Sequence, residues 1–313
     1  MKVLLIAMPF YNYEYKIKEA IESLGNHVDL VYDQEERNLL ECICCKIKPS
    51  KSSAIDKQHQ MSLLNKLSND YDIVFTIVGR WLSPDFIDIL RMKNKNAKFV
   101  LYLWDDVARV QNFNDVYKKY DKIFSFDNVD CMHYGFEFLP LFYRNEFEIR
   151  NVEKVYDLYG TLWIHSDRLN IVKKILDNYD NYKCYFYLCG LKSNYLKYKF
   201  SSEPYSKFVH YKSLDFYGNL DNMHRSKCVL DIQHPTQRGL TIRTIEAIGC
   251  GVKLITTNRE VKNYDFYMPE NICVIDRNNV EIPNVFFENP YVKLPEDVYR
   301  KYSLNNWVAK VLN

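Results

Sequence analysis

The residues best suited to chemistry lie in one stretch, Cys228–Asn258, which reads CVLDIQHPTQRGLTIRTIEAIGCGVKLITTN. Its pattern predicts a strand, a turn that contains Gly239, a helix capped by Thr241, and a second strand. Backbone N–H groups at a helix start favour phosphate, and here they would face the crevice where open α/β sheets bind ligands. Arg238 and Arg243 add cations that pair well with phosphate oxygens. A diphosphate is therefore the expected ligand of this turn.

Glu246 lies five residues into the expected helix and has two interpretations. Set back from the phosphates, its carboxylate would reach the vicinal hydroxyls of a ribose, as the acidic residue of dinucleotide-binding folds does. Alternatively, it is a solvated helix residue whose partner is Arg243, three residues before it. Spacing alone favours neither interpretation.

A second candidate site lies in the first half of the chain. Two carboxylates, Asp105 and Asp106, follow a tryptophan directly after the apolar run KFVLYL. At the carboxyl end of a strand they would bind an acceptor hydroxyl or act as a base, or else they satisfy a helix N-terminus. Arg80 and Trp81, after another apolar run, carry the same choice between an acceptor site and plain surface.

Three histidines are weaker candidates. His165 follows the expected loop at Gly160 and could face the phosphates, His234 precedes the turn, and His133 lies near the end of the first half. An isolated histidine is more often a structural hydrogen-bonding residue than a base.

Alternating apolar runs and helical patterns predict a doubly wound α/β domain over residues 1–145. Near-continuous apolar strands separated by helices are typical of a parallel sheet that is covered on both faces. The expected strands are Lys2–Met8, His27–Tyr32, Asp72–Val78, Lys98–Leu103 and Asp121–Phe126, and the expected helices are Tyr13–Leu24, Ser52–Asn69 and Pro84–Arg91 with Ser83 as its cap. The charged segment 144–154 is expected to be a linker.

The same alternation predicts a second α/β domain over 155–284. Gly160 is expected to close its first strand, and Gly249 and Gly251 to close the helix that begins at Thr241. The expected strands are Val155–Tyr159, Lys183–Leu188, Phe208–Tyr211, Cys228–Ile232, Val252–Thr257 and Asn271–Ile275, and the expected helices are Arg168–Asn178, Leu220–Ser226 and Thr241–Ile248. The tail, 285–313, is expected to form helical pieces that pack back on the first domain.

Composition limits the class of protein. The chain has 313 residues, 47% apolar and 26% charged, which is enough for two domains with real cores. The net charge of +2 argues against a nucleic-acid partner. No run approaches the ~20 apolar residues of a membrane span, and no signal peptide is recognisable, so a cytoplasmic location is expected. Nine cysteines fit free thiols there; Cys42 and Cys45 form a lone Cys-x2-Cys pair that is expected to be structural.

The stretch QRGLTIRTIEAIGCGVKLITTN, together with YDKIFSFDNVD and YGFEFLPLFYR, resembles GT-B glycosyltransferases, most closely the CgeB-like, family 1 branch of capsule and lipopolysaccharide biosynthesis. The resemblance covers most of residues 70–280. It implies two Rossmann-like domains facing across a cleft, the first for the acceptor and the second for a nucleotide sugar. It further implies a bacterial, retaining, metal-independent enzyme that moves a hexose or pentose from a nucleotide-diphosphate sugar to a hydroxyl of a surface glycan, with no other cofactor.

The resemblance also implies roles for single residues. Many retaining members carry a glutamate, seven residues and a second glutamate. Glu246 matches the second, which holds the ribose, whereas Arg238 replaces the first, which touches the donor sugar. The backbone of Gly239, Leu240 and Thr241 matches the turn that faces the diphosphate.

Other donor contacts are implied by position. Gly160 resembles the glycine loop that opens the second domain, and Arg168 follows it as a phosphate-binding cation. The nucleobase is expected near Cys189–Gly190 and His210–Lys212. The expected donor-binding set is Gly160, Arg168, His210, Tyr211, Gln237, Gly239, Leu240, Thr241, Arg243 and Glu246, the expected catalytic set is Asp105, Asp106 and Arg238, and no residue is expected to bind a metal.

Three alternatives stay open at this point. One is an inverting enzyme with Asp105 or Asp106 as base, and a second is another transferase or an epimerase of the same fold. The third is an idle sugar-nucleotide binding module, because Arg238 replaces a glutamate. The acceptor is expected to be a glycan or a lipid-linked glycan. The lysine-rich stretch Leu191–Lys212 would suit contact with the cytoplasmic face of the inner membrane, although such runs are usually solvated loops.

Overall fold

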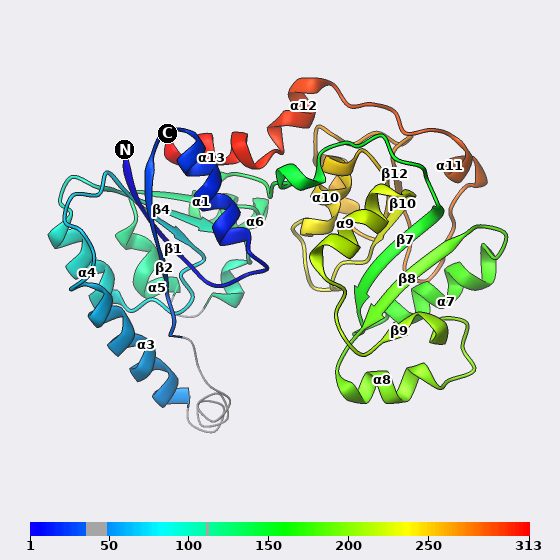
Figure 1. Ribbon diagram of the computed structural model, residues 1–313, viewed down its shortest axis with the longest axis horizontal. Helices are drawn as coiled ribbons and strands as arrows, with labels where there is room; N and C mark the ends of the chain where they lie inside the picture. The colour runs from blue at the N-terminus through cyan, green and yellow to red at the C-terminus, as the bar shows by residue number, and fades with distance from the viewer. Residues whose placement is uncertain (36–48, 111–112) are drawn as a thin grey trace. The chain divides into compact units, whose positions relative to one another are not determined.

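The computed structural model describes residues 1–35, 49–110 and 113–313, so the Cys42–Cys45 pair lies outside the described residues. The chain forms two compact units, unit 1 with residues 1–140 and 304–313 and unit 2 with residues 141–303. Each unit contains a six-stranded sheet in which every pair of neighbouring strands is parallel (Figure 1).

In unit 1 the strand order is β2-β1-β3-β4-β5-β6. The strands are β1 (Lys2–Ala7), β2 (His27–Tyr32), β3 (Ile73–Ile77), β4 (Lys98–Leu103), β5 (Lys122–Ser125) and β6 (Glu137–Phe138). The α-helices are α1 (Tyr13–Ser23), α3 (Pro49–Leu63), α4 (Pro84–Lys93), α5 (Phe113–Val116), α6 (Asn128–Tyr134) and α13 (Leu304–Leu312), with 3-10 turns η1 (Val107–Arg109) and η2 (Tyr117–Lys119). The strand order reverses between β1 and β3, so the ligand crevice of this kind of sheet is expected there.

Helices cover both faces of this sheet, as its apolar strands require. All five residues of β3 are buried, which is the burial expected for a parallel sheet between two helical layers. Helices α1 and α13 pack side by side (Figure 1), and the fully buried Trp307 of α13 contacts Phe75 and Tyr102 of the sheet. Helix α4 begins where the sequence predicts, because the Ser83 hydroxyl accepts a hydrogen bond from the backbone N–H of Phe86.

In unit 2 the strand order is β12-β11-β10-β7-β8-β9. The strands are β7 (Tyr156–Trp163), β8 (Cys184–Cys189), β9 (Val209–His210), β10 (Ser226–Asp231), β11 (Lys253–Thr256) and β12 (Ile272–Val274). The α-helices are α7 (Arg168–Asn178), α8 (Lys192–Lys199), α9 (Phe216–His224), α10 (Ile242–Cys250), α11 (Asn284–Glu288) and α12 (Glu296–Lys301), with 3-10 turns η3 (Asn145–Phe147), η4 (Ser206–Phe208) and η5 (Arg259–Asn263). If β7 to β12 are numbered 1 to 6 and the sheet is read from β9, this is the 3-2-1-4-5-6 order of dinucleotide-binding folds.

Two glycines of unit 2 do not have the positions that the sequence predicts. Gly160 lies inside β7 rather than at its end, because a Cβ there would approach the Phe186 ring to 3.0 Å and only a glycine leaves that ring room. Gly249 lies inside α10 rather than at its end, because the ring of Tyr143 packs where its side chain would be. Gly251 does end the helix, in a left-handed conformation with φ of 60°.

The unit boundaries fall near the expected domain boundaries without matching them. Unit 1 ends at residue 140, and the segment expected to be a linker, 144–154, belongs to unit 2. Within that segment Arg144 is buried and pairs with Glu146 at 2.7 Å. Of the tail, only residues 304–313 belong to unit 1. The six cysteines among the described residues are free thiols, and no helix in the described part of the chain is long and apolar enough to cross a membrane.

Candidate functional site

The candidate site of unit 2 lies where the strand order reverses, between β7 and β10. Two loops leave the sheet at the carboxyl ends of these strands, residues 164–167 and residues 232–241. Open α/β sheets bind their ligands in the crevice between two such loops. The predicted strand, turn and helix of Cys228–Asn258 therefore reach the position in the fold where a ligand is expected.

The start of α10 is anchored to the end of β10 by a carboxylate that the sequence reasoning missed. Asp231 is the last residue of β10 and is buried. Its Oδ2 accepts hydrogen bonds from the hydroxyls of Thr241 at 2.7 Å and Thr244 at 3.0 Å. Burial raises the pKa of Asp231, and these two hydroxyls oppose the rise. Thr241 also caps the helix as predicted, by accepting from the backbone N–H of Thr244.

Arg168 joins the two loops of the crevice. It is the first residue of α7, and its Nε donates to the carbonyl of Ile232 at 2.8 Å while its Nη1 donates to the carbonyl of Trp163 at 3.1 Å. Burial lowers the pKa of the guanidinium, and Asp231 opposes that fall. The predicted phosphate-binding cation is thus at the crevice, with part of its hydrogen-bonding capacity used to hold the loops together.

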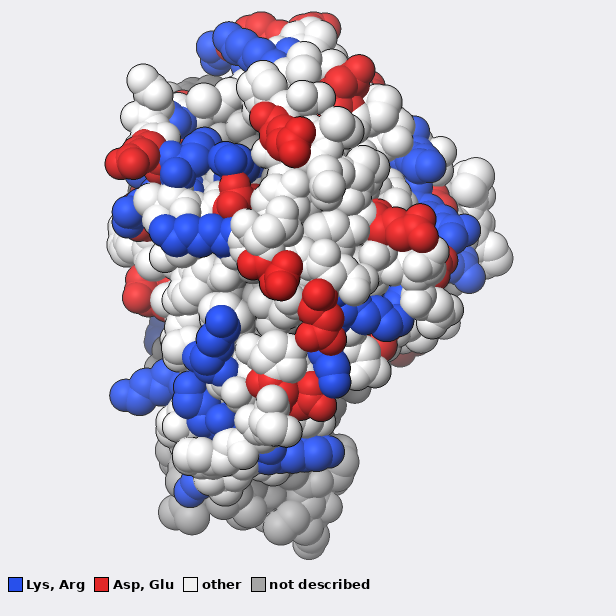
Figure 2. Space-filling model, turned by 90° about the vertical axis from the view of Figure 1, so that its right-hand side faces the viewer, with Lys and Arg blue, Asp and Glu red and all other residues white. Residues whose placement is uncertain are grey.

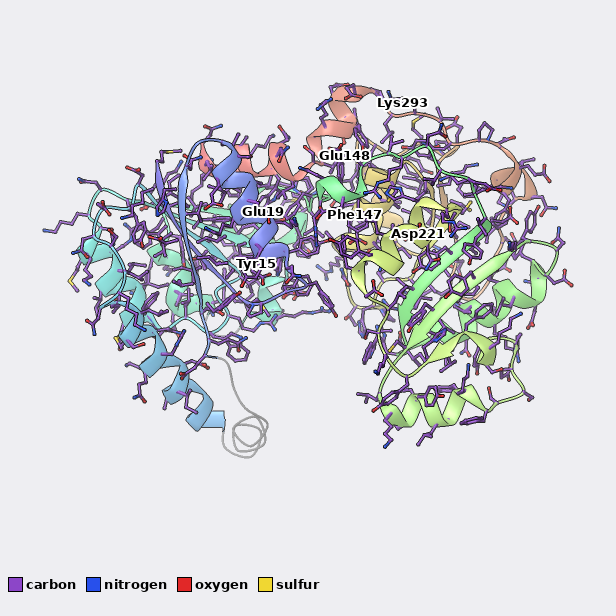
Figure 3. All side chains as sticks on the ribbon, viewed as in Figure 1. Tyr15, Glu19, Phe147, Glu148, Asp221 and Lys293 are labelled. Carbon is purple, nitrogen blue, oxygen red and sulfur yellow. The ribbon has the colours of Figure 1, made fainter. Side chains whose placement is uncertain are left out.

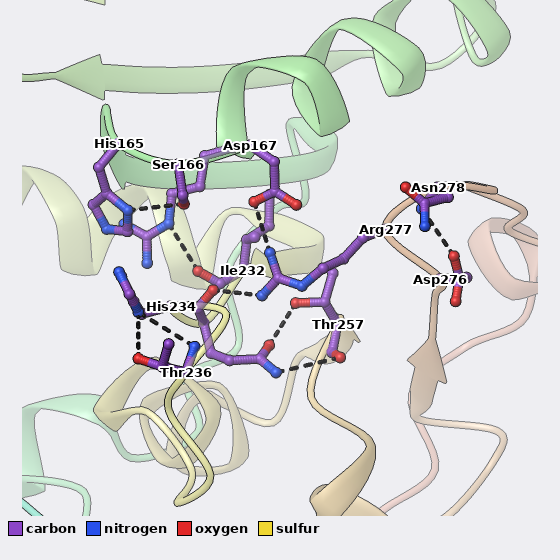
Figure 4. A network of polar contacts seen from close by, with 12 residues as sticks. His165, Ser166, Asp167, Ile232, His234, Thr236, Thr257, Asp276, Arg277 and Asn278 are labelled. Atoms are coloured by element: carbon purple, nitrogen blue, oxygen red, sulfur yellow. Dashed lines mark hydrogen bonds and ion pairs between the residues drawn. The ribbon is translucent and has the colours of Figure 1, made fainter.

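Arg277 makes a second bridge, which the sequence did not reveal (Figure 4). It follows β12, and its Nη1 pairs with Asp167 at 2.7 Å while its Nη2 donates to the carbonyl of Gln233 at 2.6 Å. The side chain of Gln233 in turn accepts from the hydroxyl of Thr257, which follows β11. The loops after β7, β10, β11 and β12 therefore form one hydrogen-bonded network at one edge of the sheet.

Two of the candidate histidines meet in this network (Figure 4). The rings of His165 and His234 lie 5.4 Å apart. His165 Nδ1 contacts the hydroxyl of Ser166 at 2.9 Å, and His234 Nδ1 accepts from the backbone N–H of Thr236 at 3.3 Å. Burial lowers the pKa of His165, and the positive charge of Arg168 lowers it further. A bound phosphate would act in the opposite direction.

The turn before α10 is held from inside and presents a cation outside. Gln237 donates its backbone N–H to the carbonyl of His234 at 2.9 Å and its side-chain amide to Gly239 at 3.3 Å. Asn258 donates to the carbonyls of Arg238 and Gly239, each at 3.3 Å. Gly239 and Leu240 are buried, whereas Arg238 is exposed. Its side chain is therefore accessible from the solvent.

Arg243 and Glu246 form an ion pair of 2.9 Å beside α9. This pair is the one expected if Glu246 is a structural helix residue. The glutamate is not solvated as that alternative supposed, however, since only 6% of it is exposed. Arg243 also contacts the Asn219 side chain and the sulfur of Met223, both at 3.2 Å. The structure thus directs part of Arg243 towards α9 rather than towards the turn.

Three expected donor contacts lie away from this turn. Gly160 packs against Phe186 in the core of unit 2. His210 lies on β9, two strands from β7, and stacks on Tyr187 with ring centroids 3.9 Å apart. Tyr211 follows it and is 53% exposed. Gly160 is thus a core residue, whereas His210 and Tyr211 lie at the carboxyl end of β9, where the nucleobase is expected.

The two neighbouring aspartates of unit 1, Asp105 and Asp106, each form an ion pair with a different arginine. Asp105 pairs with Arg80 at 2.7 Å, and Asp106 pairs with Arg109 at 3.1 Å. Asp106 lies at the N-terminus of the 3-10 turn η1, as the alternative of a helix-terminal acid expects, although its side chain makes no capping hydrogen bond there. Arg80 and Asp105 follow β3 and β4 and join the carboxyl ends of these two neighbouring strands.

A buried carboxylate that the sequence reasoning did not single out lies in the same unit. Asp33 follows β2 and is 1% exposed, and neither of its side-chain oxygens has a hydrogen-bond partner among the residues that the structure describes. Burial raises its pKa to about 7. Nothing in the local sequence marks it, because the elements that bury it come from distant positions.

No three histidine, cysteine, aspartate or glutamate side chains within the described residues gather closely enough to hold a metal ion. The polar network of unit 2 is built from arginines, amides, hydroxyls and backbone groups instead. Such groups favour an anionic, hydrogen-bonding ligand.

Comparison with known proteins rests on structure. No protein-family model and no curated protein sequence matches the chain. Among solved structures, a point mutant of T4 phage BGT in complex with UDP-glucose is similar with a TM-score of 0.53 at 12% identity, over 99% of this chain and 98% of that one. The Staphylococcus aureus MnaA–UDP structure is similar with a TM-score of 0.52 at 12% identity, over 100% and 95% of the two chains.

A third similar structure is a putative UDP-N-acetylglucosamine 2-epimerase from Listeria monocytogenes, with a TM-score of 0.50 at 11% identity over 99% of this chain and 94% of that one. These likenesses extend over both units. Two six-stranded parallel sheets with helices on their faces are the GT-B fold, so the predicted fold class is confirmed. At this identity the likeness concerns the fold, and the chemistry has to be argued from the residues of the site.

Proposed function

We infer that the protein is a glycosyltransferase that moves a sugar from a nucleotide-diphosphate sugar to a hydroxyl of a glycan. The observation that carries this proposal is the network at the β7–β10 edge of unit 2. There, the start of α10, the exposed Arg238 and the bridging Arg168 and Arg277 surround the crevice of a 3-2-1-4-5-6 sheet. A diphosphate suits this arrangement, and the similar BGT and MnaA structures contain UDP-glucose and UDP.

The donor is assigned to unit 2 with roles that follow the contacts. The N–H groups at the start of α10 and the side chain of Arg238 bind the diphosphate and stabilise the charge that develops on it as the sugar leaves. Arg168 and Arg277 fix the loops that shape the crevice. Glu246 remains the proposed ribose ligand, with Arg243 holding its carboxylate at 2.9 Å. Metal independence is part of the proposal, since arginines and helix dipole supply the positive charge.

The acceptor is assigned to unit 1, at the carboxyl edge of β3 and β4. Asp105 or Asp106 would take the proton of the acceptor hydroxyl if the enzyme inverts the anomeric centre. The resemblance of the segment that contains Glu246 to retaining enzymes favours retention instead, although Arg238 departs from their pattern. The acceptor class that the resemblance suggests is a capsule, O-antigen or exopolysaccharide glycan made in the bacterial cytoplasm.

Contact with the inner membrane is the least direct part of the proposal. The segment Leu191–Lys212 forms α8 and the turn η4, and it exposes Leu196 by 56% and Phe200 by 78%. Lysine and arginine side chains are spread over the lower part of the face seen in Figure 2, the end at which α8 lies. Basic residues beside exposed apolar ones suit an anionic lipid surface.

The test is to incubate the protein with UDP-, GDP-, dTDP- and ADP-glucose, with CMP-linked sugar, and with glycan acceptors. We expect one donor to release its nucleotide faster when an acceptor is present, and EDTA to leave that rate unchanged. Conversion of the donor to an epimer without acceptor would support an epimerase instead. Donor binding without turnover would support a binding module. The anomeric proton coupling of the product separates retention from inversion.

A further inference from the structure

We propose that three loops at the carboxyl edge of the unit 1 sheet form a binding site for a neutral sugar ring, with the loop after β1 as its aromatic platform. The site comprises Phe10 and Tyr11 after β1, Arg80 after β3, and Trp104 and Asp105 after β4. The inference rests on the proposed function in one respect, because it takes the bound sugar to be the acceptor.

The three loops meet because of the strand order. Strand β3 lies between β1 and β4, and the order reverses between β1 and β3. Their carboxyl ends therefore share one edge, at the position where sheets of this kind bind ligands. The rings confirm the meeting, since Phe10 and Trp104 lie 5.3 Å apart although 94 residues separate them along the chain.

The loop after β1 is built to present its rings. The buried carboxylate of Glu14 accepts from the backbone N–H of Phe10 at 3.1 Å, and Tyr13 N–H donates to the carbonyl of Phe10 at 2.9 Å. Tyr11 and Asn12 both have positive φ, 49° and 63°. A tyrosine in this conformation is uncommon and costs free energy. The fixed backbone turns Tyr11 outwards, where 77% of it is exposed.

The aromatic groups form one cluster with an exposed outer ring. Phe10 contacts Tyr11 edge to face at 5.1 Å, and it contacts Trp104 at 5.3 Å. Tyr13 supports Trp104 from the buried side at 6.5 Å. A pyranose ring has a face of C–H bonds that packs against aromatic rings and an edge of hydroxyls that needs polar partners. The cluster supplies the first of these surfaces.

The ion pair beside the cluster supplies the second. Arg80 Nη2 and Asp105 Oδ2 lie 2.7 Å apart, so a donor and an acceptor stand next to each other, which is the pattern that two neighbouring hydroxyls match. The Nε of Arg80 is buried and has no hydrogen-bond partner within the described part of the chain. A guanidinium nitrogen with this unmet requirement favours a ligand that brings an acceptor oxygen.

Charge decides between a neutral ring and a phosphorylated one. The loops 8–12, 78–81 and 104–109 contain two arginines, Arg80 and Arg109, and two aspartates, Asp105 and Asp106, so their net charge is zero. Each arginine is paired with one of the aspartates. A phosphate would meet two carboxylates without a surplus cation, whereas hydroxyl groups are compatible with both charges. The site therefore favours a neutral sugar over a nucleotide.

Saturation-transfer NMR tests the proposal without requiring turnover. The probes are the methyl pyranosides of glucose, galactose, mannose and N-acetylglucosamine, with the full-length protein. We expect at least one probe to receive saturation on its C–H protons, and the substitution Tyr11→Asn to weaken its binding about five- to ten-fold. Asparagine tolerates positive φ, so this change removes the ring without adding backbone strain.

A matched control and a second variant keep the result interpretable. Tyr15→Asn removes another exposed tyrosine, labelled in Figure 3, whose hydroxyl contacts Tyr32 at the end of β2, on the other side of β1 from β4. It is expected to bind the probe like the wild type. Trp104→Leu is expected to weaken binding as Tyr11→Asn does.

Two outcomes would overturn the inference. One is that a pyranoside binds equally well to the wild type and to Tyr11→Asn. The other is that no pyranoside binds; if Tyr11→Asn then abolishes binding of a short single-stranded oligonucleotide, the rings are a platform for bases. Stabilisation by nucleoside diphosphates, measured on the same variants, tests unit 2 separately. If no nucleoside diphosphate stabilises the wild type or any variant, the proposed function is contradicted, whereas the sugar site in unit 1 is not.

Discussion

The Nε atom of Arg168 donates a 2.8 Å hydrogen bond to the carbonyl oxygen of Ile232, and this bond joins the loops that follow β7 and β10. The two strands lie side by side where the sheet order reverses. Together with Arg277, which bridges Asp167 and Gln233 of the same two loops, this side chain holds the crevice in which unit 2 is proposed to bind its donor.

Replacing Arg168 should weaken both the fold and the site. In Arg168→Ala the carbonyl of the buried Ile232 loses its partner, and an unpaired buried polar group costs about 1–3 kcal/mol. We expect a loss of that size in the free energy of unfolding measured with urea, together with weaker nucleotide binding. Lysine cannot replace a guanidinium that donates from two nitrogens, so Arg168→Lys should recover little. An unchanged urea midpoint in Arg168→Ala would show that the bridge does not stabilise the loops.

The Arg243–Glu246 pair offers a test of two roles for one glutamate. Only 7% of the glutamate side chain and 19% of the arginine side chain are exposed. Removing one partner of a buried pair costs about 3–5 kcal/mol, whereas replacing both by apolar residues is often neutral. Glu246→Ala should therefore unfold more easily, and Arg243→Met combined with Glu246→Leu should restore most of the stability.

Nucleotide binding separates the two roles. If Glu246 binds ribose, the stable double variant still loses nucleotide affinity when it is measured by calorimetry. A double variant that binds nucleotide as the wild type does would leave Glu246 with a structural role alone.

Asp33 should make stability depend on pH. Burial raises its pKa to about 7 from an ordinary value near 3.8. Between these values the folded chain holds a proton that the unfolded chain releases, so this group's contribution falls as pH rises from 4 to 7. Asp33→Asn, which mimics the protonated acid, should raise stability at pH 8 by a few kcal/mol and leave it nearly unchanged at pH 4. A variant that is less stable than the wild type at pH 8 would contradict this account.

The local rules predicted much of the fold because they depend on neighbouring residues. Ser83 and Thr241 cap helices where hydroxyl side chains precede helical patterns. Continuous apolar runs such as that of β3 indicate strands buried on both faces. The same rules wrongly predicted that Gly160 and Gly249 end their strand and helix. Each glycine instead leaves room for an aromatic ring that is remote in sequence, Phe186 for Gly160 and Tyr143 for Gly249.

The network of the site depends on contacts that no local pattern records. Arg277 meets Asp167 across 110 residues and Gln233 across 44. Asp231 could have been noticed, since an acid at the end of an apolar strand needs a partner. Whether Glu246 is buried depends on how α9 packs beside α10, and its spacing within the helix says nothing about that.

The central claim is that the crevice of unit 2 binds a nucleoside diphosphate, and thermal unfolding with UDP, GDP, CMP, dTDP and ADP tests it most directly. The variant is Arg238→Ala, because Arg238 is exposed and, within the described residues, only its backbone carbonyl takes part in a hydrogen bond. The matched control is Arg225→Ala. Arg225 is exposed and pairs with Asp221, which Figure 3 labels. Because Arg225 directly precedes β10, it lies at the opposite edge of the sheet.

The account predicts that one nucleotide raises the melting temperature of the wild type and of Arg225→Ala, by the amount that RT ln(1 + [L]/Kd) sets. In Arg238→Ala the same nucleotide should bind about ten-fold more weakly, because a charge-assisted contact to phosphate is lost. The account is contradicted if no nucleotide stabilises the wild type, or if Arg238→Ala and Arg225→Ala respond alike.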